Sequence, residues 1–359
     1  PNAEADITGI SFEEDVLANS YIDLNPSYDE SQNAYPIRLS VKEGTDMTSL
    51  APIFELTPGA TISPASGSVQ NFTTPVRYTV TSEDKAWHRV YAITAREQKA
   101  SNIPTTYHFE KVRIMQNVWQ EFYEEQDSGN ELTWASGNKG FKWAMSEAAT
   151  EDYPTTQIDN GKTGKCVKLE TRLTGDLGNM VGMPIAAGNL FIGSFDMLNA
   201  ITNPLSATRF GTPFYNKPLR LTGYYKYKAG EQFYENGEYT SRKDIFNIYA
   251  IFYDGVKYDS AGKGTDVTLD GNLPNQNYEH SSMVALALVS NPQETEGDEW
   301  KFFDIPFDYQ RYGKKIDEAR LAKGEYKIGI IFASSKDGAT FEGAPGSTLL
   351  IDEVELIYE

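Results

Sequence analysis

The stretch Thr348-Leu-Leu-Ile-Asp-Glu-Val-Glu-Leu-Ile-Tyr358 decides the fold class of this chain. From Leu350 onward, every second residue except one is apolar or aromatic, which is the period of a β-strand with one buried face. The exception is Asp352, which falls on the same face, whereas Glu353 and Glu355 fall on the opposite one. The stretch therefore predicts a long strand against a hydrophobic core, with one carboxylate pointing the same way as the apolar side chains.

Eight more strand-like runs precede this strand, and polar loops separate them. They are Tyr107–Ile114, Lys165–Thr171, Leu190–Asp196, Leu219–Tyr227, Ile245–Tyr253, Val284–Ser290, Trp300–Pro306 and Glu325–Ala333. Helical signal is weak, and residues 316–322 predict one or two helical turns that end at Gly324. Nine strands joined by long polar loops predict a jelly-roll β-sandwich over residues 105–359.

The first 97 residues contain shorter strand-like runs, with turn signals such as Pro58-Gly59 and Ser66-Gly67 between them. The polar segment 98–104, which ends in Pro104, is predicted to be a linker. Several short strands at this spacing predict a second, smaller β-sandwich over residues 1–97, so the whole chain is expected to be all-β. The predicted strands of this part are Ile7–Phe12, Tyr35–Val41, Ile53–Glu55, Val76–Thr81 and Val90–Thr94.

The composition narrows the classes of function. A formal net charge of −19 is unfavourable for binding nucleic-acid phosphates or anionic lipid heads. No apolar run approaches the ~20 residues of a membrane-spanning helix. The single cysteine, Cys166, excludes an intrachain disulfide and is expected to be a small buried residue. Because the sequence begins with Pro1 rather than Met, we expect that a leader has been removed.

A hairpin near the end of the first sandwich carries a family resemblance. It reads Phe72-Thr-Thr-Pro-Val-Arg-Tyr-Thr-Val-Thr-Ser-Glu-Asp84, followed by Tyr91-Ala-Ile-Thr94. It resembles the last hairpin of Ig-like modules in surface lipoproteins of Bacteroides-type bacteria. The resemblance implies an Ig-like sandwich that spaces the second domain from a lipid-anchored N-terminus. It also implies a secreted protein at the cell surface or outer membrane, with the periplasm as the alternative and the anchor as the only membrane contact.

Three segments of the second domain stand in an order that is typical of jelly-roll carbohydrate-binding modules. With Arg220–Tyr227 and Trp300–Phe302, they resemble the putative carbohydrate metabolism domain of Bacteroides-type bacteria over most of residues 105–359. The resemblance implies a role near glycans and names no reaction. The three segments are Tyr107-His-Phe-Glu110, Asn160-Gly-Lys-Thr-Gly-Lys-Cys-Val-Lys-Leu-Glu-Thr171 and Gly346-Ser-Thr-Leu-Leu-Ile-Asp-Glu-Val-Glu-Leu356.

Two carboxylates of these segments form a candidate metal site. Glu110 is predicted to align with Val112 and Ile114, as Asp352 does with its apolar neighbours, and a buried carboxylate is costly unless it is paired or binds a metal. In calcium-binding jelly-roll modules the matching residues help to hold a structural Ca²⁺, so the resemblance implies that Glu110 and Asp352 do so here. The alternative is that Asp352 caps a loop or pairs with a basic residue.

Candidate glycan contacts follow from the chemistry of sugar recognition. Sugars stack their C–H faces on aromatic rings, and amides or carboxylates bind their hydroxyl groups. Polar and glycine-rich sequence surrounds three aromatic residues and two amides, which we predict to contact the ligand. For each aromatic residue the alternative is packing in the core, as expected for Trp119. The predicted contacts are Trp134, Trp143, Tyr215, Asn138 and Asn216.

Motifs for catalysis are missing from the sequence. The three histidines match no zinc motif, and there is no G-x-S-x-G element. Glu353 and Glu355 lie two apart on one strand and are better explained as solvent-facing charges than as a glycosidase pair. We therefore expect non-catalytic binding of a poly- or oligosaccharide. A structural or adhesive surface protein with a protein partner is the second hypothesis, and a glycoside hydrolase is the third.

Overall fold

The computed structural model describes residues 2–359. The chain divides into two compact units between Ala100 and Ser101, and Glu359 belongs to the first. We call the part that ends at Ala100 unit 1 and Ser101–Tyr358 unit 2. The division falls inside the 98–104 segment that was predicted as a linker. Among the described residues, no helix combines the length and apolar character that crossing a membrane requires.

Unit 1 is a small β-sandwich. One sheet has the order β2-β6-β5-β4, in which β2 runs parallel to β6, and a second sheet pairs β1 with β3. Alternation places Tyr78 and Val80 of β5, and Tyr91 and Ile93 of β6, in the core. This confirms the predicted β-sandwich. The strands are β1 (Ile7–Ser11), β2 (Tyr35–Val41), β3 (Ile53–Leu56), β4 (Thr61–Ser63), β5 (Val76–Thr81) and β6 (His88–Glu97).

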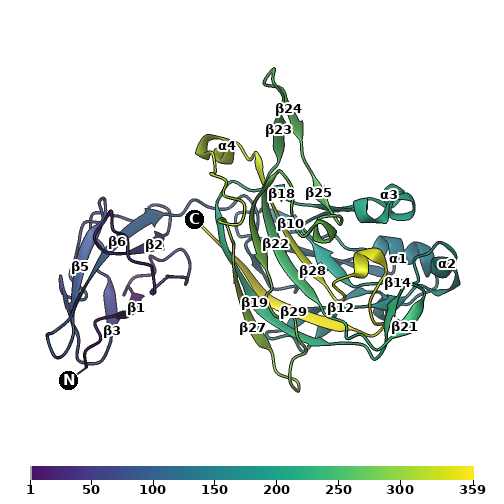
Figure 1. Ribbon diagram of the computed structural model, residues 1–359, viewed down its shortest axis with the longest axis horizontal. Coiled ribbons are helices and arrows are strands. Elements are labelled where there is room, and N and C mark those ends of the chain that lie inside the picture. Colours follow the sequence, from purple (N-terminus) through teal and green to yellow (C-terminus); the bar gives the residue numbers. More distant parts are fainter. Residues whose placement is uncertain (1) are drawn as a thin grey trace. The chain divides into compact units, whose positions relative to one another are not determined.

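Unit 2 is a larger sandwich of two sheets. The six-stranded sheet has the order β11-β12-β29-β19-β27, with β7 beside β29, and the five-stranded sheet has the order β15-β28-β22-β26, with β18 beside β28. The long strands of both sheets are visible in Figure 1. Their bounds are β7 (Thr106–Tyr107), β11 (Thr155–Asp159), β12 (Lys165–Glu170), β15 (Asn189–Phe191), β18 (Thr212–Pro213), β19 (Pro218–Lys228), β22 (Asn247–Asp254), β26 (Met283–Leu288), β27 (Lys301–Pro306), β28 (Tyr326–Ala333) and β29 (Thr348–Tyr358).

The main core of unit 2 lies between these sheets. Leu221 of β19 and Ile351 of β29 come from one sheet, and Ile248 of β22 and Phe332 of β28 come from the other, all fully buried. A separate cluster lies on the outer face of the five-stranded sheet and includes Tyr249 of β22. The expected all-β jelly-roll architecture is therefore confirmed, and its five-stranded sheet is covered on both faces.

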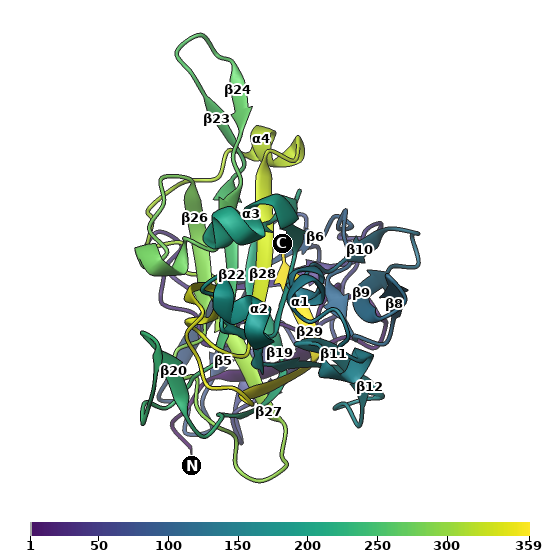
Figure 2. The same cartoon turned by 90° about the vertical axis from the view of Figure 1, so that its right-hand side faces the viewer.

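Short elements surround the sandwich. Figure 2 shows α1, α2 and α3 in front of β22 and β28, which places them over the outer face of the five-stranded sheet. The helices are α1 (Asn138–Ala144), α2 (Gly175–Met180), α3 (Met197–Thr202) and α4 (Glu318–Ala322). The 3₁₀ turns are η1 (Thr150–Asp152), η2 (Pro204–Ser206), η3 (Pro274–Gln276) and η4 (Gly338–Thr340). The minor strands are β8 (Val112–Met115), β9 (Trp119–Glu125), β10 (Glu131–Thr133), β13 (Arg172–Leu173), β14 (Ile185–Ala186), β16 (Gly193–Phe195), β17 (Thr208–Phe210), β20 (Phe233–Glu235), β21 (Glu238–Thr240), β23 (Val256–Tyr258), β24 (Gly264–Asp266) and β25 (Leu269–Asp270).

Side-chain caps explain where two of the helices begin. At α3 the carboxylate of Asp196 accepts the backbone N–H of Leu198 at 2.9 Å. At α4 the carboxylate of Asp317 accepts the N–H of Ala319 at 2.9 Å. Such caps satisfy N–H groups that have no partner inside the helix. The predicted turn of helix within residues 316–322 is thus confirmed as α4.

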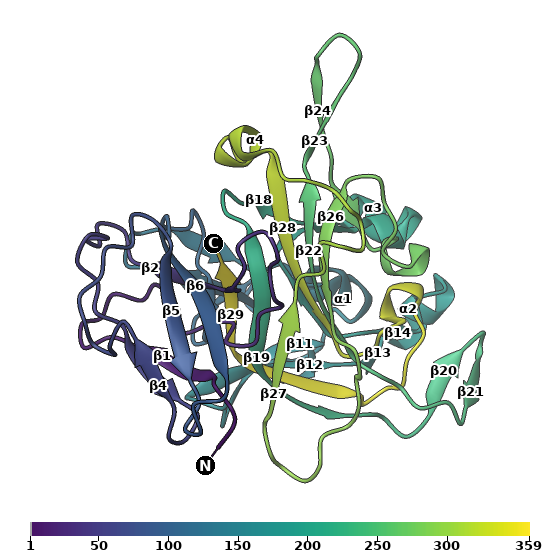
Figure 3. The same ribbon diagram turned by 60° about the vertical axis from the view of Figure 1, so that its left-hand side comes forward.

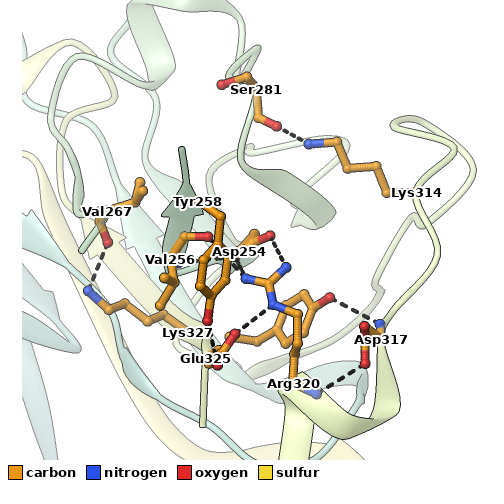
Figure 4. Close-up of polar contacts among 11 residues, drawn as sticks. Asp254, Val256, Tyr258, Val267, Ser281, Lys314, Asp317, Arg320, Glu325 and Lys327 are labelled. Atoms are coloured by element: carbon orange, nitrogen blue, oxygen red, sulfur yellow. Dashed lines mark hydrogen bonds and ion pairs between the residues drawn. The ribbon is translucent and has the colours of Figure 1, made fainter. Parts of the chain in front are cut away.

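The β23–β24 hairpin projects beyond the two sheets (Figure 3). Arg320 of α4 fixes its base, because the guanidinium donates to both carboxylate oxygens of Asp254 at 2.7 and 2.6 Å and to Glu325 at 2.6 Å (Figure 4). It also donates to the carbonyl of Val256 at 3.0 Å. Two carboxylates arranged in this way match the planar, forked guanidinium. They hold the base of the hairpin to the residue that precedes β28.

Candidate functional site

A cavity of about 190 Å³ lies on the outer face of the five-stranded sheet, among side chains of α1, α3, β22 and β28. Its wall is mainly apolar, with small residues of the helices between the rings. Aromatic side chains from seven positions line it: Phe141, Trp143, Phe191, Phe195, Phe210, Tyr249 and Phe341. We call this space the sheet cavity.

The floor of the sheet cavity is built by two rows of residues across three neighbouring strands. In one row Ala333 of β28 pairs with Asn189 of β15 on one side and with Asn247 of β22 on the other. In the next row Ile331 is flanked in the same way by Phe191 and Tyr249. All six side chains line the cavity. The floor therefore has one row with two amide side chains and a neighbouring row with two aromatic rings. Between the two amides, the small side chain of Ala333 leaves open space.

Several polar groups on this floor have a hydrogen-bond donor or acceptor without a partner among residues 2–359. The Asn247 amide donates to the Tyr278 hydroxyl at 2.9 Å, and its carbonyl oxygen has no partner among residues 2–359. The side-chain carbonyl oxygen of Asn189 accepts the backbone N–H of Gly137 at 2.7 Å, and its side-chain amide nitrogen has no partner among residues 2–359. The hydroxyl of Tyr249 likewise has no partner in the described chain. Burial raises the pKa of Tyr249, so this hydroxyl keeps its proton.

Trp143 stands at the edge of the cavity. Its side chain lines the cavity and remains 38% exposed, so one part of the indole is available to a ligand. It belongs to α1, whose position is set by Asn138. The Asn138 amide donates to the Thr155 carbonyl at 2.8 Å, and its oxygen accepts the Thr155 N–H at 3.1 Å. This exchange with β11 anchors the helix and thereby positions Trp143.

The structure corrects three of the predicted glycan contacts. Trp134 is 1% exposed and packs in the main core, so it has no face for a surface ligand. Asn138 is fully buried, and both of its polar atoms serve the anchoring contacts with Thr155. Asn216 is also buried. In the sequence these residues stand among polar neighbours, but their side chains turn inward.

Tyr215 is exposed, as predicted, but it does not line the sheet cavity. Its ring covers Gly324 closely enough that a Cβ on that glycine would lie 2.6 Å from the ring. Tyr215 therefore packs over the turn that ends α4. Of the five predicted contacts, Trp143 alone reaches the cavity.

The two predicted metal ligands meet at one loop, although not on the predicted face. Ile351 and Val354 both enter the core, whereas Asp352 and Glu353 between them do not, because a bulge at Glu353, with φ of +48°, breaks the alternation of β29. Asp352 is nonetheless fully buried, and one oxygen accepts the N–H of Thr163 at 3.0 Å. Burial raises the pKa of Asp352 to about 6.

Glu110 also differs from its predicted position in a strand beside Val112 and Ile114. The predicted strand Tyr107–Ile114 is split into β7 and β8, and Glu110 lies between them, exposed rather than buried. One of its oxygens accepts the N–H of Lys165 at 2.7 Å. Glu110 and Asp352 therefore hold the two ends of the Thr163–Lys165 turn. Both are oxygen donors that suit Ca²⁺, but no group of three or more metal-ligating side chains occurs within residues 2–359.

One buried carboxylate near the cavity was not predicted. Asp244 is 3% exposed, and it accepts hydrogen bonds from the hydroxyls of Ser335 and Ser347 at 2.6 and 2.7 Å and from the N–H of Ala344 at 2.8 Å. Its other oxygen accepts the N–H of Ile245 at 2.9 Å. Asp244 thus ties the start of β22 to the loop that enters β29, and it has a structural role.

Comparison with known proteins assigns the family. A family model described as a putative carbohydrate metabolism domain matches residues 108–357, which is most of unit 2. The chain belongs to this family. A second model, described as SGBP, N-terminal, matches residues 23–95 of unit 1. No curated protein matches the chain.

Two solved structures support the membership in the putative carbohydrate metabolism domain family. One, a protein of Bacteroides thetaiotaomicron described as a putative glycoside hydrolase, is 45% identical, covers 100% of this chain and 98% of its own, and has a TM-score of 0.64. Another with the same description, from Bacteroides vulgatus, is 50% identical, covers 72% of this chain and 100% of its own, and has a TM-score of 0.67. A family 61 carbohydrate-binding module bound to β-1,4-galactotriose, at 12% identity, covers 57% of this chain and 83% of its own with a TM-score of 0.22, which is too weak a likeness to indicate a fold or a ligand.

Proposed function

We propose that unit 2 binds a glycan without cleaving it, and that the sheet cavity receives part of that glycan. The observation that carries the proposal is an aromatic cavity whose floor has unused hydrogen-bonding groups on Asn189, Asn247 and Tyr249. Aromatic walls with a few convergent polar groups are the usual design of a ligand site. The description of the family as a putative carbohydrate metabolism domain supports a carbohydrate as the ligand.

Hydrolysis is less well supported at this cavity. Glycosidases use a pair of carboxyl groups on either side of the scissile bond. Among the described residues that line the sheet cavity there is no Asp or Glu. Three carboxylates line a separate hollow, but Glu147 and Asp152 are exposed and Glu170 is ion-paired, so none has the apolar surroundings of a general acid.

A protein partner is the second candidate function, supported by exposed apolar side chains near the cavity. Met180 of α2 and Leu198 of α3 are 82% and 86% exposed, and Leu177 and Ile201 of the same helices are also exposed. Apolar side chains gathered in this way mark interaction surfaces. The match of unit 1 to the SGBP N-terminal model supports a place at a bacterial cell surface for either function, with a lipid anchor as part of the same proposal.

Replacing Trp143 with alanine tests the proposed site. We expect retention on the recognised polysaccharide to fall about 5- to 30-fold, because a half-exposed aromatic anchor contributes about 1–2 kcal/mol to binding. The measurement is affinity electrophoresis, after a glycan array has identified the polysaccharide class.

The matched control for this experiment is Trp87→Ala. Trp87 is 64% exposed and belongs to unit 1. Unchanged retention by a folded Trp143→Ala protein would place the glycan elsewhere. An array without any bound glycan would favour the protein-partner function.

We also propose that Glu110 and Asp352 hold a structural Ca²⁺ beside the Thr163–Lys165 turn. Calcium takes six to eight oxygen ligands, so backbone carbonyls and water would supply the remainder. After dialysis against EDTA, added Ca²⁺ is expected to raise the melting temperature by several degrees, since a ligand at 100 times its Kd stabilises by about 2.7 kcal/mol. Asp352→Asn should abolish the shift. A melting temperature that Ca²⁺ leaves unchanged would show that the two carboxylates are simple acceptors for the backbone of the turn.

A further inference from the structure

The amide row of the sheet cavity has a specific hydrogen-bonding pattern. Asn189 presents an unused N–H donor, Asn247 presents an unused carbonyl acceptor, and Ala333 lies between them on the middle strand. Since neighbouring strands are about 4.8 Å apart, the two asparagine backbones are about 10 Å apart. Side chains stand roughly perpendicular to a sheet, so the space above Ala333 is of similar width and leaves room for one small planar group that accepts on one side and donates on the other.

The rest of the cavity limits what that group can be attached to. The adjoining row contains Phe191 and Ile331, and Ala200 and Ile201 of α3 add further apolar surface. A hydroxyl group buried against such a wall without a partner is costly. The cavity of about 190 Å³ is also smaller than the ~300–1,000 Å³ of typical ligand pockets. The site therefore suits a small substituent with an apolar end more than a whole oligosaccharide.

We infer that the sheet cavity binds the acetamido group of an N-acetylated sugar residue. A trans secondary amide points its carbonyl and its N–H in opposite directions, which matches a donor on Asn189 and an acceptor on Asn247. The acetyl methyl then fits over Ala333, the one floor position without a larger side chain. The inference rests on the proposed glycan-binding function and narrows it to one class of sugar.

Tyr249 supplies a further contact in this arrangement. Its hydroxyl has no partner within residues 2–359, its side chain is 3% exposed, and it lies two residues from Asn247 on the same face of β22. It can therefore donate to a ring hydroxyl or to the amide carbonyl of the bound sugar. Leaving such a group unpaired inside a protein is costly, so a ligand that pairs with it gains affinity.

The test compares sugars that differ only in the acetamido group. Methyl glycosides of N-acetylglucosamine and N-acetylgalactosamine are measured against those of glucose and galactose, by calorimetry and by saturation-transfer NMR on the full chain. We expect the N-acetylated member of a pair to bind at least ten-fold more tightly, with the strongest saturation on its acetyl methyl. Equal affinities within both pairs, or saturation that spares the methyl, would overturn the inference.

Two variants place this binding at the cavity floor. Ala333→Leu fills the space between the two asparagines and is expected to abolish the N-acetyl preference. Tyr249→Phe removes a hydroxyl that has no internal partner, so the protein should fold normally while the affinity falls several-fold. Tyr239→Phe, at an exposed position outside the cavity lining, is the matched control and should bind like the original protein. Unchanged affinity in both floor variants would also overturn the inference.

The outcomes separate this inference from the proposed function. Trp143-dependent retention of a polysaccharide, with equal binding of the paired sugars, leaves glycan binding intact and removes the acetamido specificity. Failure of every polysaccharide and every sugar to bind removes both proposals together.

Discussion

Replacing Trp134 with alanine is expected to lower the free energy of unfolding of unit 2 by about 3–5 kcal/mol, the range for removing a large aromatic side chain from a core. The indole is 1% exposed, and its ring centroid lies 5.0 Å from that of Tyr107, 5.7 Å from that of Phe109 and 5.9 Å from that of Phe332. These rings come from β7, from the turn after it and from β28. The substitution therefore opens a cavity where both sheets meet.

Calorimetry of the full chain measures this effect, because unit 1 does not contain the substitution. For a domain of this size, each kcal/mol lowers the melting temperature by roughly 2–4 °C, so a decrease of about 10 °C is expected in the transition of unit 2. Trp143→Ala is the matched control, and at a half-exposed position it should cost about 1 kcal/mol or less. Similar decreases for the two variants would contradict the burial of Trp134.

Trp134 and Trp143 have similar sequence surroundings but differ in burial. Both stand among polar and glycine-rich neighbours, so composition gives them the same interpretation. The difference is set by strand pairing. The backbone N–H of Trp134 donates to the backbone carbonyl of Phe122 at 2.8 Å, and this bond brings the β9–β10 hairpin into the sandwich. Trp143, in contrast, lies near the end of α1. Long-range contacts of this kind leave no local pattern in the sequence.

Most of the strands were predictable because each has its own alternation of buried and exposed side chains. Val76–Thr81 and Thr348–Tyr358 have the predicted bounds. The face of Asp352 was predicted wrongly, because a single residue in the left-handed region, Glu353, shifts the alternation of β29. A bulge adds one residue to a strand without changing its apolar composition, so the sequence does not reveal it.

The sequence could not predict the floor of the sheet cavity for a related reason. Asn247 and Tyr249 lie in a predicted strand, and their spacing of two shows that they share a face. Their neighbours Ala333 and Asn189 come from strands far away in the chain, and only the register of the five-stranded sheet aligns them. The signal that could have singled out this strand is the pair of polar residues on a face that is otherwise apolar.

Replacing Asp244 with alanine is expected to destabilise unit 2 by about 3–5 kcal/mol, since four hydrogen-bond donors lose their acceptor inside the protein. No cation pairs with Asp244 among the described ion pairs, so these donors are what stabilises its charge. Two of them, Ala344 and Ser347, belong to the loop that enters β29, the strand at the centre of the six-stranded sheet. The loss should therefore be accompanied by faster proteolysis of that loop.

Asp244→Asn separates the hydrogen bonds from the charge. The amide oxygen can still accept from Ser335, Ser347 and Ala344, so this variant should lose less stability than the alanine variant. Burial raises the pKa of Asp244 from its ordinary value, so the folded state binds its proton more tightly than the unfolded state does. Protonation of Asp244 therefore adds stability at low pH, and this contribution is lost as the pH rises through the raised pKa. Because asparagine does not titrate, the deficit of Asp244→Asn relative to the original protein should be larger at pH 4, near the ordinary pKa of Asp, than at pH 8 in urea unfolding. A deficit that grows with pH would mean that the four donors outweigh burial and hold Asp244 ionised.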